Sequence, residues 1–181
     1  MLNKIVIIQK HIEKKILKDY FLIEGKVDLD SSYFINKIIE GFREIENKSG
    51  KTNIEGLMTS FTYFNKDTEF LKIIKNLISY VDSEIKLNSY YLKNSWGFCT
   101  NKNEKTKYHN HESQMFSGVL YLNSHDLCLN FNEINKTIKP EKGKFVLFSS
   151  FLKHGTDVSY YEDTRWGISF DFSWVSFYDH K

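Results

Sequence analysis

Three histidines form the group in this chain whose types and spacing most favour chemistry. His109 and His111 are one residue apart, and His154 follows 43 residues after His111. Side chains two apart on an extended strand point the same way, so the first two imidazoles make two arms of a metal clamp. The fold would have to bring in the third. Imidazole suits Fe, Zn, Cu and Ni, so the pattern indicates a transition-metal site, unless the pair is a chance feature of a solvated loop.

An arginine with a polar strand face follows the last of these histidines. Arg165 is one of only two arginines, against 23 lysines. Its planar, always charged fork is suited to hold a carboxylate through paired hydrogen bonds. Alternation places Arg165, Gly167, Ser169 and Asp171 on one face, which predicts a pocket for an anion with a gap at the glycine. The alternative is an amphipathic edge strand with Arg165 in solvent.

Length and composition set the broad class. A chain of 181 residues fits one domain, 1–181, with about 1–86 as mixed helical and strand support and about 87–178 as the core. A net charge of +2, with scattered lysines, gives no sign of nucleic-acid binding. The apolar run Ile5–Ile8 is too short for a signal segment or a membrane span. We therefore expect a soluble cytoplasmic protein.

Other features of the composition bear on source and on secondary residues. The absence of alanine suggests an AT-rich coding sequence, as in a virus or a reduced-genome bacterium, and a viral protein would act in the host cytoplasm. Cys99 and Cys128 are expected to be packing residues without a bridge. The remaining histidines are expected to be ordinary surface residues: His11, His125 and His180.

Two helices and a run of strands are expected along the chain. A helix capped by Ser31 or Ser32 should end near Asn47–Gly50, and a second should cover about Lys66–Asp82. Short aromatic and β-branched runs then predict strands at Asn88–Thr100, Met115–Leu122, Cys128–Phe131, Lys144–Phe148 and Arg165–Tyr178. With the helices placed upstream, the expected fold is mainly β with N-terminal helices (α+β), with a double-stranded β-helix, or jelly roll, as core.

Several ordered motifs carry a resemblance to a known family. They occupy residues 94–96 (NSW), 109–122 (HNHESQMFSGVLYL), 143–154 (GKFVLFSSFLKH) and 165–170 (RWGISF). Together they resemble the 2-oxoglutarate/Fe(II)-dependent oxygenases over residues 94–172. The nearest likeness is to an uncharacterised group of these oxygenases with an HxH…H motif, and a more distant one is to the prolyl 4-hydroxylase branch.

The resemblance implies an enzyme, its cofactors and the roles of its residues. It implies a dioxygenase that uses Fe(II), 2-oxoglutarate and O2 to hydroxylate a substrate, with release of succinate and CO2. The three histidines would hold Fe(II), Arg165 would pair with the distal carboxylate of 2-oxoglutarate, and Tyr121 and Ser169 would donate hydroxyl hydrogen bonds to it. From the residues alone, a core position for Tyr121 stays open as the alternative. Trp96 is either on the substrate side or in the core, as are Phe98 and Trp166.

One position departs from the common pattern of the superfamily. Most members carry a carboxylate where this chain has His111, which leaves the metal about one charge more positive. Three outcomes stay open: His111 ligates, it swings away and leaves a vacancy, or His109 is displaced. Glu112 should point to the opposite face of the strand, whereas Asp171 is a candidate for a ligand or for a partner of a ligand.

Two other functions remain as alternatives. A three-histidine dioxygenase of the cupin kind would need no 2-oxoglutarate and no anion cradle around Arg165. A non-catalytic β-sandwich binding module would keep the fold without a metal. The substrate, a small molecule or a peptide, is not specified by the motifs, because loops would read it.

Overall fold

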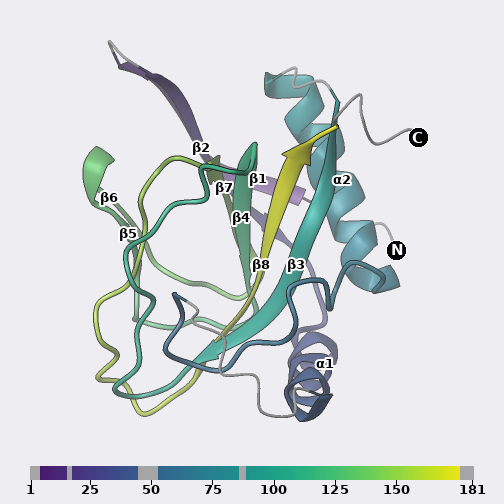
Figure 1. Ribbon diagram of the computed structural model, residues 1–181, viewed down its shortest axis with the longest axis vertical. Helices are drawn as coiled ribbons and strands as arrows, with labels where there is room; N and C mark the ends of the chain where they lie inside the picture. Colours follow the sequence, from purple (N-terminus) through teal and green to yellow (C-terminus); the bar gives the residue numbers. More distant parts are fainter. Residues whose placement is uncertain (1–4, 16–17, 45–52, 86–88, 176–181) are drawn as a thin grey trace.

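A six-stranded antiparallel sheet is the frame of the computed structural model, which describes residues 5–15, 18–44, 53–85 and 89–175. The strand order is β1-β2-β7-β4-β8-β3. Both helices lie on one side of this sheet, and β5 and β6 lie on the other (Figure 1). In chain order the elements are β1 (Ile5–Lys15), β2 (Lys18–Val27), α1 (Ser31–Glu44), α2 (Thr68–Ile85), β3 (Tyr90–Thr100), β4 (Phe116–Tyr121), β5 (Leu129–Phe131), β6 (Lys136–Ile138), β7 (Lys144–Ser149) and β8 (Arg165–Trp174).

Two hydrophobic clusters cover the two faces of the large sheet. On β7, Phe145 and Leu147 belong to the cluster under the helices, whereas Val146 and Phe148 belong to the cluster on the opposite face. This alternation follows from the period of two along a strand. The strands therefore read as continuous apolar runs because they are covered on both sides. The opposite face combines its own apolar cluster with a pocket, since Tyr121 and Phe148 belong to both.

The second layer of the jelly roll is small and irregular. It contains the β5–β6 pair and isolated bridges, among them His109 with His154 and Asn130 with Gly155. The expectation of a mainly β jelly roll with helices is confirmed. Apart from the β5–β6 pair, the segments of this layer meet through single bridges, whereas the strands of the large sheet pair over several residues.

An aspartate immediately precedes each helix and caps its first turn. Asp30 Oδ1 accepts hydrogen bonds from the backbone of Ser32 and Tyr33, at 3.0 and 3.1 Å, and Asp67 Oδ1 accepts one from Phe70 at 2.8 Å. The expected cap at Ser31 or Ser32 was wrong by one residue, since a carboxylate at residue 30 satisfies the free N–H groups of the first turn. The second helix, expected at Lys66–Asp82, starts two residues later and ends three later.

The N-terminal strands correct the expectation that helices come first. β1 and β2 precede α1, and β2 pairs with β7 in the middle of the large sheet. Glu24 interrupts the apolar pattern of β2, so the sequence did not indicate a buried strand there. The residue is buried because Lys136 at 3.1 Å and Lys144 at 3.9 Å neutralise it. Paired buried charges do not show in a hydrophobic pattern. The short strand β6 was also missed.

The remaining expectations concern the cysteines, membrane-spanning helices, and residues near the limits of the described ranges. Cys99 and Cys128 are free thiols, as expected. Within the described ranges, no helix has the length and apolarity that crossing a membrane requires. The expected helix end at Asn47–Gly50 and the end of the last strand at Tyr178 lie outside the described residues, as does His180.

A matched pair of leucines on α2 tests the packing of helix on sheet. Leu77 is 1% exposed in the helix-side cluster, whereas Leu71 is 36% exposed. We expect Leu77→Ala to lower the free energy of unfolding by about 2–5 kcal/mol, because it leaves a cavity. Leu71→Ala should change it by less than about 1 kcal/mol. Urea denaturation measures both, and equal losses would contradict the packing described.

Candidate metal centre

Backbone pairing brings the three histidines together. His109 N donates to His154 O at 3.0 Å, and His154 N donates to His109 O at 2.9 Å. His111 N donates to Ser150 O at 2.7 Å, which fastens the second histidine beside the end of β7. One ligand atom from each imidazole lies within 4.8 Å of the others, a spread that a single metal ion can bridge. The segment that carries His109 and His111 lies between β3 and β4 and belongs to no strand.

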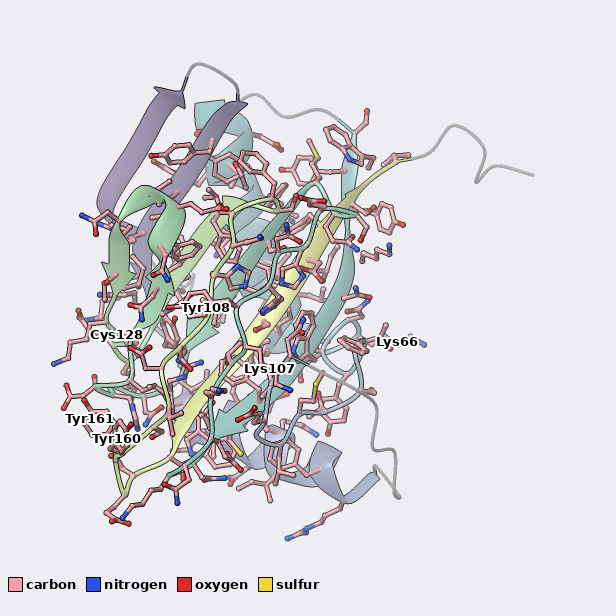
Figure 2. The ribbon with its side chains drawn as sticks, turned by 60° about the vertical axis from the view of Figure 1, so that its left-hand side comes forward. Lys66, Lys107, Tyr108, Cys128, Tyr160 and Tyr161 are labelled. Carbon is pink, nitrogen blue, oxygen red and sulfur yellow. The ribbon has the colours of Figure 1, made fainter. Side chains whose placement is uncertain are left out.

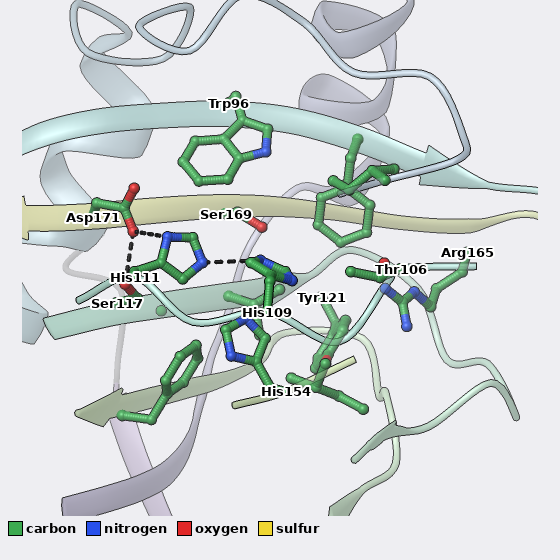
Figure 3. Close-up of a pocket in the computed structure, with 16 residues that line it drawn as sticks. Trp96, Thr106, His109, His111, Ser117, Tyr121, His154, Arg165, Ser169 and Asp171 are labelled. Carbon is green, nitrogen blue, oxygen red and sulfur yellow. Dashed lines mark hydrogen bonds and ion pairs between the residues drawn. The ribbon is translucent and has the colours of Figure 1, made fainter. Parts of the chain in front are cut away.

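The imidazoles turn corresponding nitrogens toward one another (Figure 3). His109 Nδ1 faces Lys107 O at 2.7 Å, and His154 Nδ1 faces Leu152 O at 3.0 Å. A carbonyl accepts only from N–H, so both Nε2 atoms carry lone pairs. His109 Nε2 lies 3.1 Å from His111 Nε2. Lone pairs converging on one point are what a cation needs.

Burial keeps two of these imidazoles neutral. It lowers the pKa of His154 to about 3, and the neighbouring His109 adds to this. Burial also lowers the pKa of His109, against the opposing effect of its bond to Lys107 O. Neutral imidazole is the form that binds metals, so the site is prepared for a cation at physiological pH.

The two side chains that precede the first histidine lie at the surface. Lys107 and Tyr108 precede His109 and are exposed (Figure 2). Tyr108 is 43% exposed, whereas His154 is 6% exposed. His109 is less exposed than these two neighbours, and its ring lies beside the buried His154 ring with centroids 4.5 Å apart, although no regular strand contains it.

Arg165 is buried in the same pocket, and no acidic side chain of the described residues pairs with it. It is 2% exposed and lies between the rings of Phe98 and Tyr121, whose centroids are 5.3 and 5.8 Å away. Its Nη1 donates to Leu127 O at 3.3 Å, and its Nε has no hydrogen-bond partner among the described residues. A buried guanidinium without a counter-charge is costly, so this arrangement favours an anionic ligand.

Two hydroxyls accompany the arginine. Tyr121 OH is buried and has no partner among the described residues, and Ser169 also lines the pocket. Burial raises the pKa of Tyr121 to about 12, so its phenol keeps a proton to donate. The expected gap at Gly167 is not open, because a Cβ there would lie 2.5 Å from the Phe98 ring. The glycine makes room for the ring that stacks on Arg165.

Asp171 and the aromatic candidates Trp96 and Trp166 lie in different places, and Phe98 is the ring beside Arg165. Asp171 is 3% exposed and lies beside His111. Trp96 is 6% exposed, lines the pocket and has no partner for its indole N–H among the described residues. Trp166 lies on the opposite face of β8 and stacks on Phe42, so it is a core residue.

The other histidines stand apart from the pocket. His125 was expected on the surface, but it is 4% exposed. Its Nδ1 accepts from Leu127 N at 2.9 Å and its Nε2 donates to Asp163 O at 3.0 Å. The ring joins two loops, and the polar sequence around it concealed this. His11 lies on β1, and only its backbone is described.

Several lining residues were not anticipated. Ser117 precedes Tyr121 by four residues on β4, so the period of two could have identified it. Asn94, two residues before Trp96 on β3, does not line the pocket itself but approaches Asp171, which does. An outer opening next to the histidines is lined by residues from an irregular segment that carries no periodic signal, Asn53, Ile54, Met58 and Phe61.

Comparisons with known proteins begin with two negative results. No protein-family model matches the chain. A search of curated proteins also returned no match. Similarity is therefore found at the level of the fold.

Solved structures share the architecture. Viral collagen prolyl hydroxylase from Paramecium bursaria Chlorella virus-1, in complex with 2-oxoglutarate, is 15% identical with a TM-score of 0.65, over 82% of this chain and 94% of that one. A Pseudomonas putida prolyl 4-hydroxylase is 14% identical with a TM-score of 0.64, over 86% and 93%. The chain has the fold of the 2-oxoglutarate/Fe(II) oxygenases.

A third match has a different bound molecule. HygX from Streptomyces hygroscopicus, with nickel, 2-oxoglutarate and hygromycin B bound, is 11% identical with a TM-score of 0.59, over 85% of this chain and 82% of that one. At such low identities the likeness establishes the fold alone. The case for a particular chemistry rests on the pocket of this chain.

Removal of one histidine tests the metal centre. We expect metal-free protein to bind one Fe(II) in an anaerobic titration, and His154→Ala to weaken binding by at least about 100-fold. The control is Asn110→Ala, between two of the histidines, whose amide donates outward to Glu112. This variant should bind as the unchanged protein does. Equal affinity in all three proteins would place the metal elsewhere.

Proposed function

We propose that this protein is a 2-oxoglutarate- and Fe(II)-dependent oxygenase with a three-histidine metal site. The observation that carries the proposal is Arg165, which is buried in the pocket that the three histidines enter and has no acidic partner in the part of the chain that the structure describes. A metal-binding module has no need of a buried guanidinium. A dicarboxylate that reaches from the metal to Arg165 would satisfy both ends of the pocket.

The donor set fits these cofactors residue by residue. His109, His111 and His154 would hold Fe(II), Arg165 would hold the distal carboxylate of 2-oxoglutarate, and Tyr121 and Ser169 would each donate a hydrogen bond to it. The bound iron, 2-oxoglutarate and O2 would supply the oxidation, with succinate and CO2 as products. The protein orients the co-substrate and keeps its charged end out of water.

The outer opening gives the route for the molecule to be oxidised. Ile54, Met58, Phe61 and Trp96 line it, and it reaches His109 and His111. A small molecule or a peptide would enter here and meet the metal from the side away from Arg165. Phe61 is 52% exposed and its ring meets Trp96 edge to face, with centroids 5.3 Å apart, so an aromatic wall flanks the entrance.

An anaerobic titration of the Fe(II)-loaded protein with 2-oxoglutarate tests the proposal. We expect the visible charge-transfer band of a chelated 2-oxo acid, and succinate once air is admitted. Arg165→Ala should weaken 2-oxoglutarate binding by roughly 30-fold or more, since it removes a charge-assisted contact worth about 2–5 kcal/mol. Its Fe(II) affinity should not change.

The control is Arg43→Ala, because Arg43 is the only other arginine and is exposed on α1. It should bind 2-oxoglutarate as the unchanged protein does. No band in the unchanged protein, or an undiminished band in Arg165→Ala at limiting 2-oxoglutarate, would contradict the proposal. Fe(II) binding without any response to 2-oxoglutarate would favour the cupin-type alternative.

A further inference from the structure

His111 differs from the other two histidines in what its second nitrogen meets. His109 and His154 each direct Nδ1 at a backbone carbonyl. His111 directs Nδ1 at a carboxylate, Asp171 Oδ1, at 3.3 Å (Figure 3). The histidine that stands where a carboxylate ligand is usual is thus the one whose ring contacts a carboxylate.

The carboxylate of Asp171 is fixed by its own partners. Ser117 Oγ donates to Oδ1 at 2.7 Å, and Asn94 Nδ2 approaches Oδ2 at 3.4 Å. Both partners lie on strands next to β8, and both are paired in register with Asp171. A buried carboxylate held by two neighbouring strands cannot turn easily, so it can hold the imidazole that contacts it.

Asp171 is not itself among the converging ligand atoms. In the part of the chain that the structure describes, the group of acidic, histidine and cysteine side chains that could share one metal ion contains the three histidines alone. Oδ1 of Asp171 is already engaged by His111 and Ser117. It lies beside Nδ1 of His111, whereas Nε2 of the same ring faces His109.

We infer that Asp171 is a positioning residue that makes His111 serve in place of a carboxylate ligand. Its Oδ1 accepts a hydrogen bond from Nδ1–H of His111, which leaves the Nε2 lone pair for the metal and fixes the plane of the ring. It also places a negative charge next to a ligand set that is otherwise neutral, and so offsets the charge lost with the usual carboxylate. This inference rests on the proposed function, since it presumes Fe(II) at the three histidines.

Metal titrations of a charge variant test the inference. Asp171→Asn keeps an acceptor oxygen near His111 and removes the charge. We expect its Fe(II) affinity to fall by about 10–100-fold under anaerobic conditions, and the absorption bands of Co(II) bound in place of Fe(II) to shift. Asp171→Glu should recover part of the affinity. The control is Asp28→Asn, which removes one exposed carboxylate and should bind as the unchanged protein does.

A second substitution returns the carboxylate to the usual place. In Asp171→Asn, the added change His111→Asp should restore Fe(II) affinity, because the charge then sits on the ligand itself. His111→Asp alone should bind less well than the double variant, since two carboxylates would then face each other in a buried space. This reversal is not expected if Asp171 only supports the fold.

A milder variant covers the case in which Asp171→Asn does not fold. Ser117→Ala keeps the charge and removes the shortest hydrogen bond to it, and it should weaken Fe(II) binding by roughly 2–10-fold. Unchanged affinity and unchanged Co(II) bands in both Asp171→Asn and Ser117→Ala would overturn the inference while the proposed function stands. Failure of the unchanged protein to bind Fe(II) would overturn both.

Discussion

The reciprocal backbone pairing of His109 with His154 is the constraint on which the site depends. Two hydrogen bonds of 3.0 and 2.9 Å join segments that are far apart in the sequence. Bridges between Asn130 and Gly155 and between Ile54 and Thr106 lie in the same layer. Without these backbone hydrogen bonds and bridges, the segment that carries His109 and His111 would be a polar loop. Ordering that loop costs chain entropy, and contacts between the imidazoles alone would not offset the cost.

The large sheet makes this layer possible by dividing its two faces between different tasks. On β8, Ile168 and Phe170 belong to the helix-side cluster, whereas Arg165, Ser169 and Asp171 line the pocket. The apolar half of the strand anchors it, so the polar half can keep costly groups in fixed positions. Stability and chemistry are thus carried by alternate residues of one strand.

Sequence patterns identified those parts of the molecule that repeat regularly. The period of two on β8 predicted its pocket face, and the spacing of apolar residues predicted α1 and α2. Patterns failed where a tertiary partner changes the meaning of a residue: Glu24 is neutralised by distant lysines, and His125 is buried through contacts with backbone from a distant loop. The mouth of the pocket was also beyond reach, since loop segments place Ile54 and Phe61 by irregular geometry.

Charge within the pocket is distributed in a way that suits a dicarboxylate. Arg165 and Asp171 share a face of β8, but six residues of strand, roughly 20 Å, separate their Cα atoms. The side chains that affect the pKa of Asp171 are His111, Ser117 and Asn94, whose hydrogen bonds lower it against the opposing effect of burial; for Arg165 they are Tyr121 and Cys128. The two charges therefore do not neutralise each other. Asp171 contacts His111, Ser117 and Asn94, whereas Arg165 would be neutralised by the dicarboxylate of the proposed function.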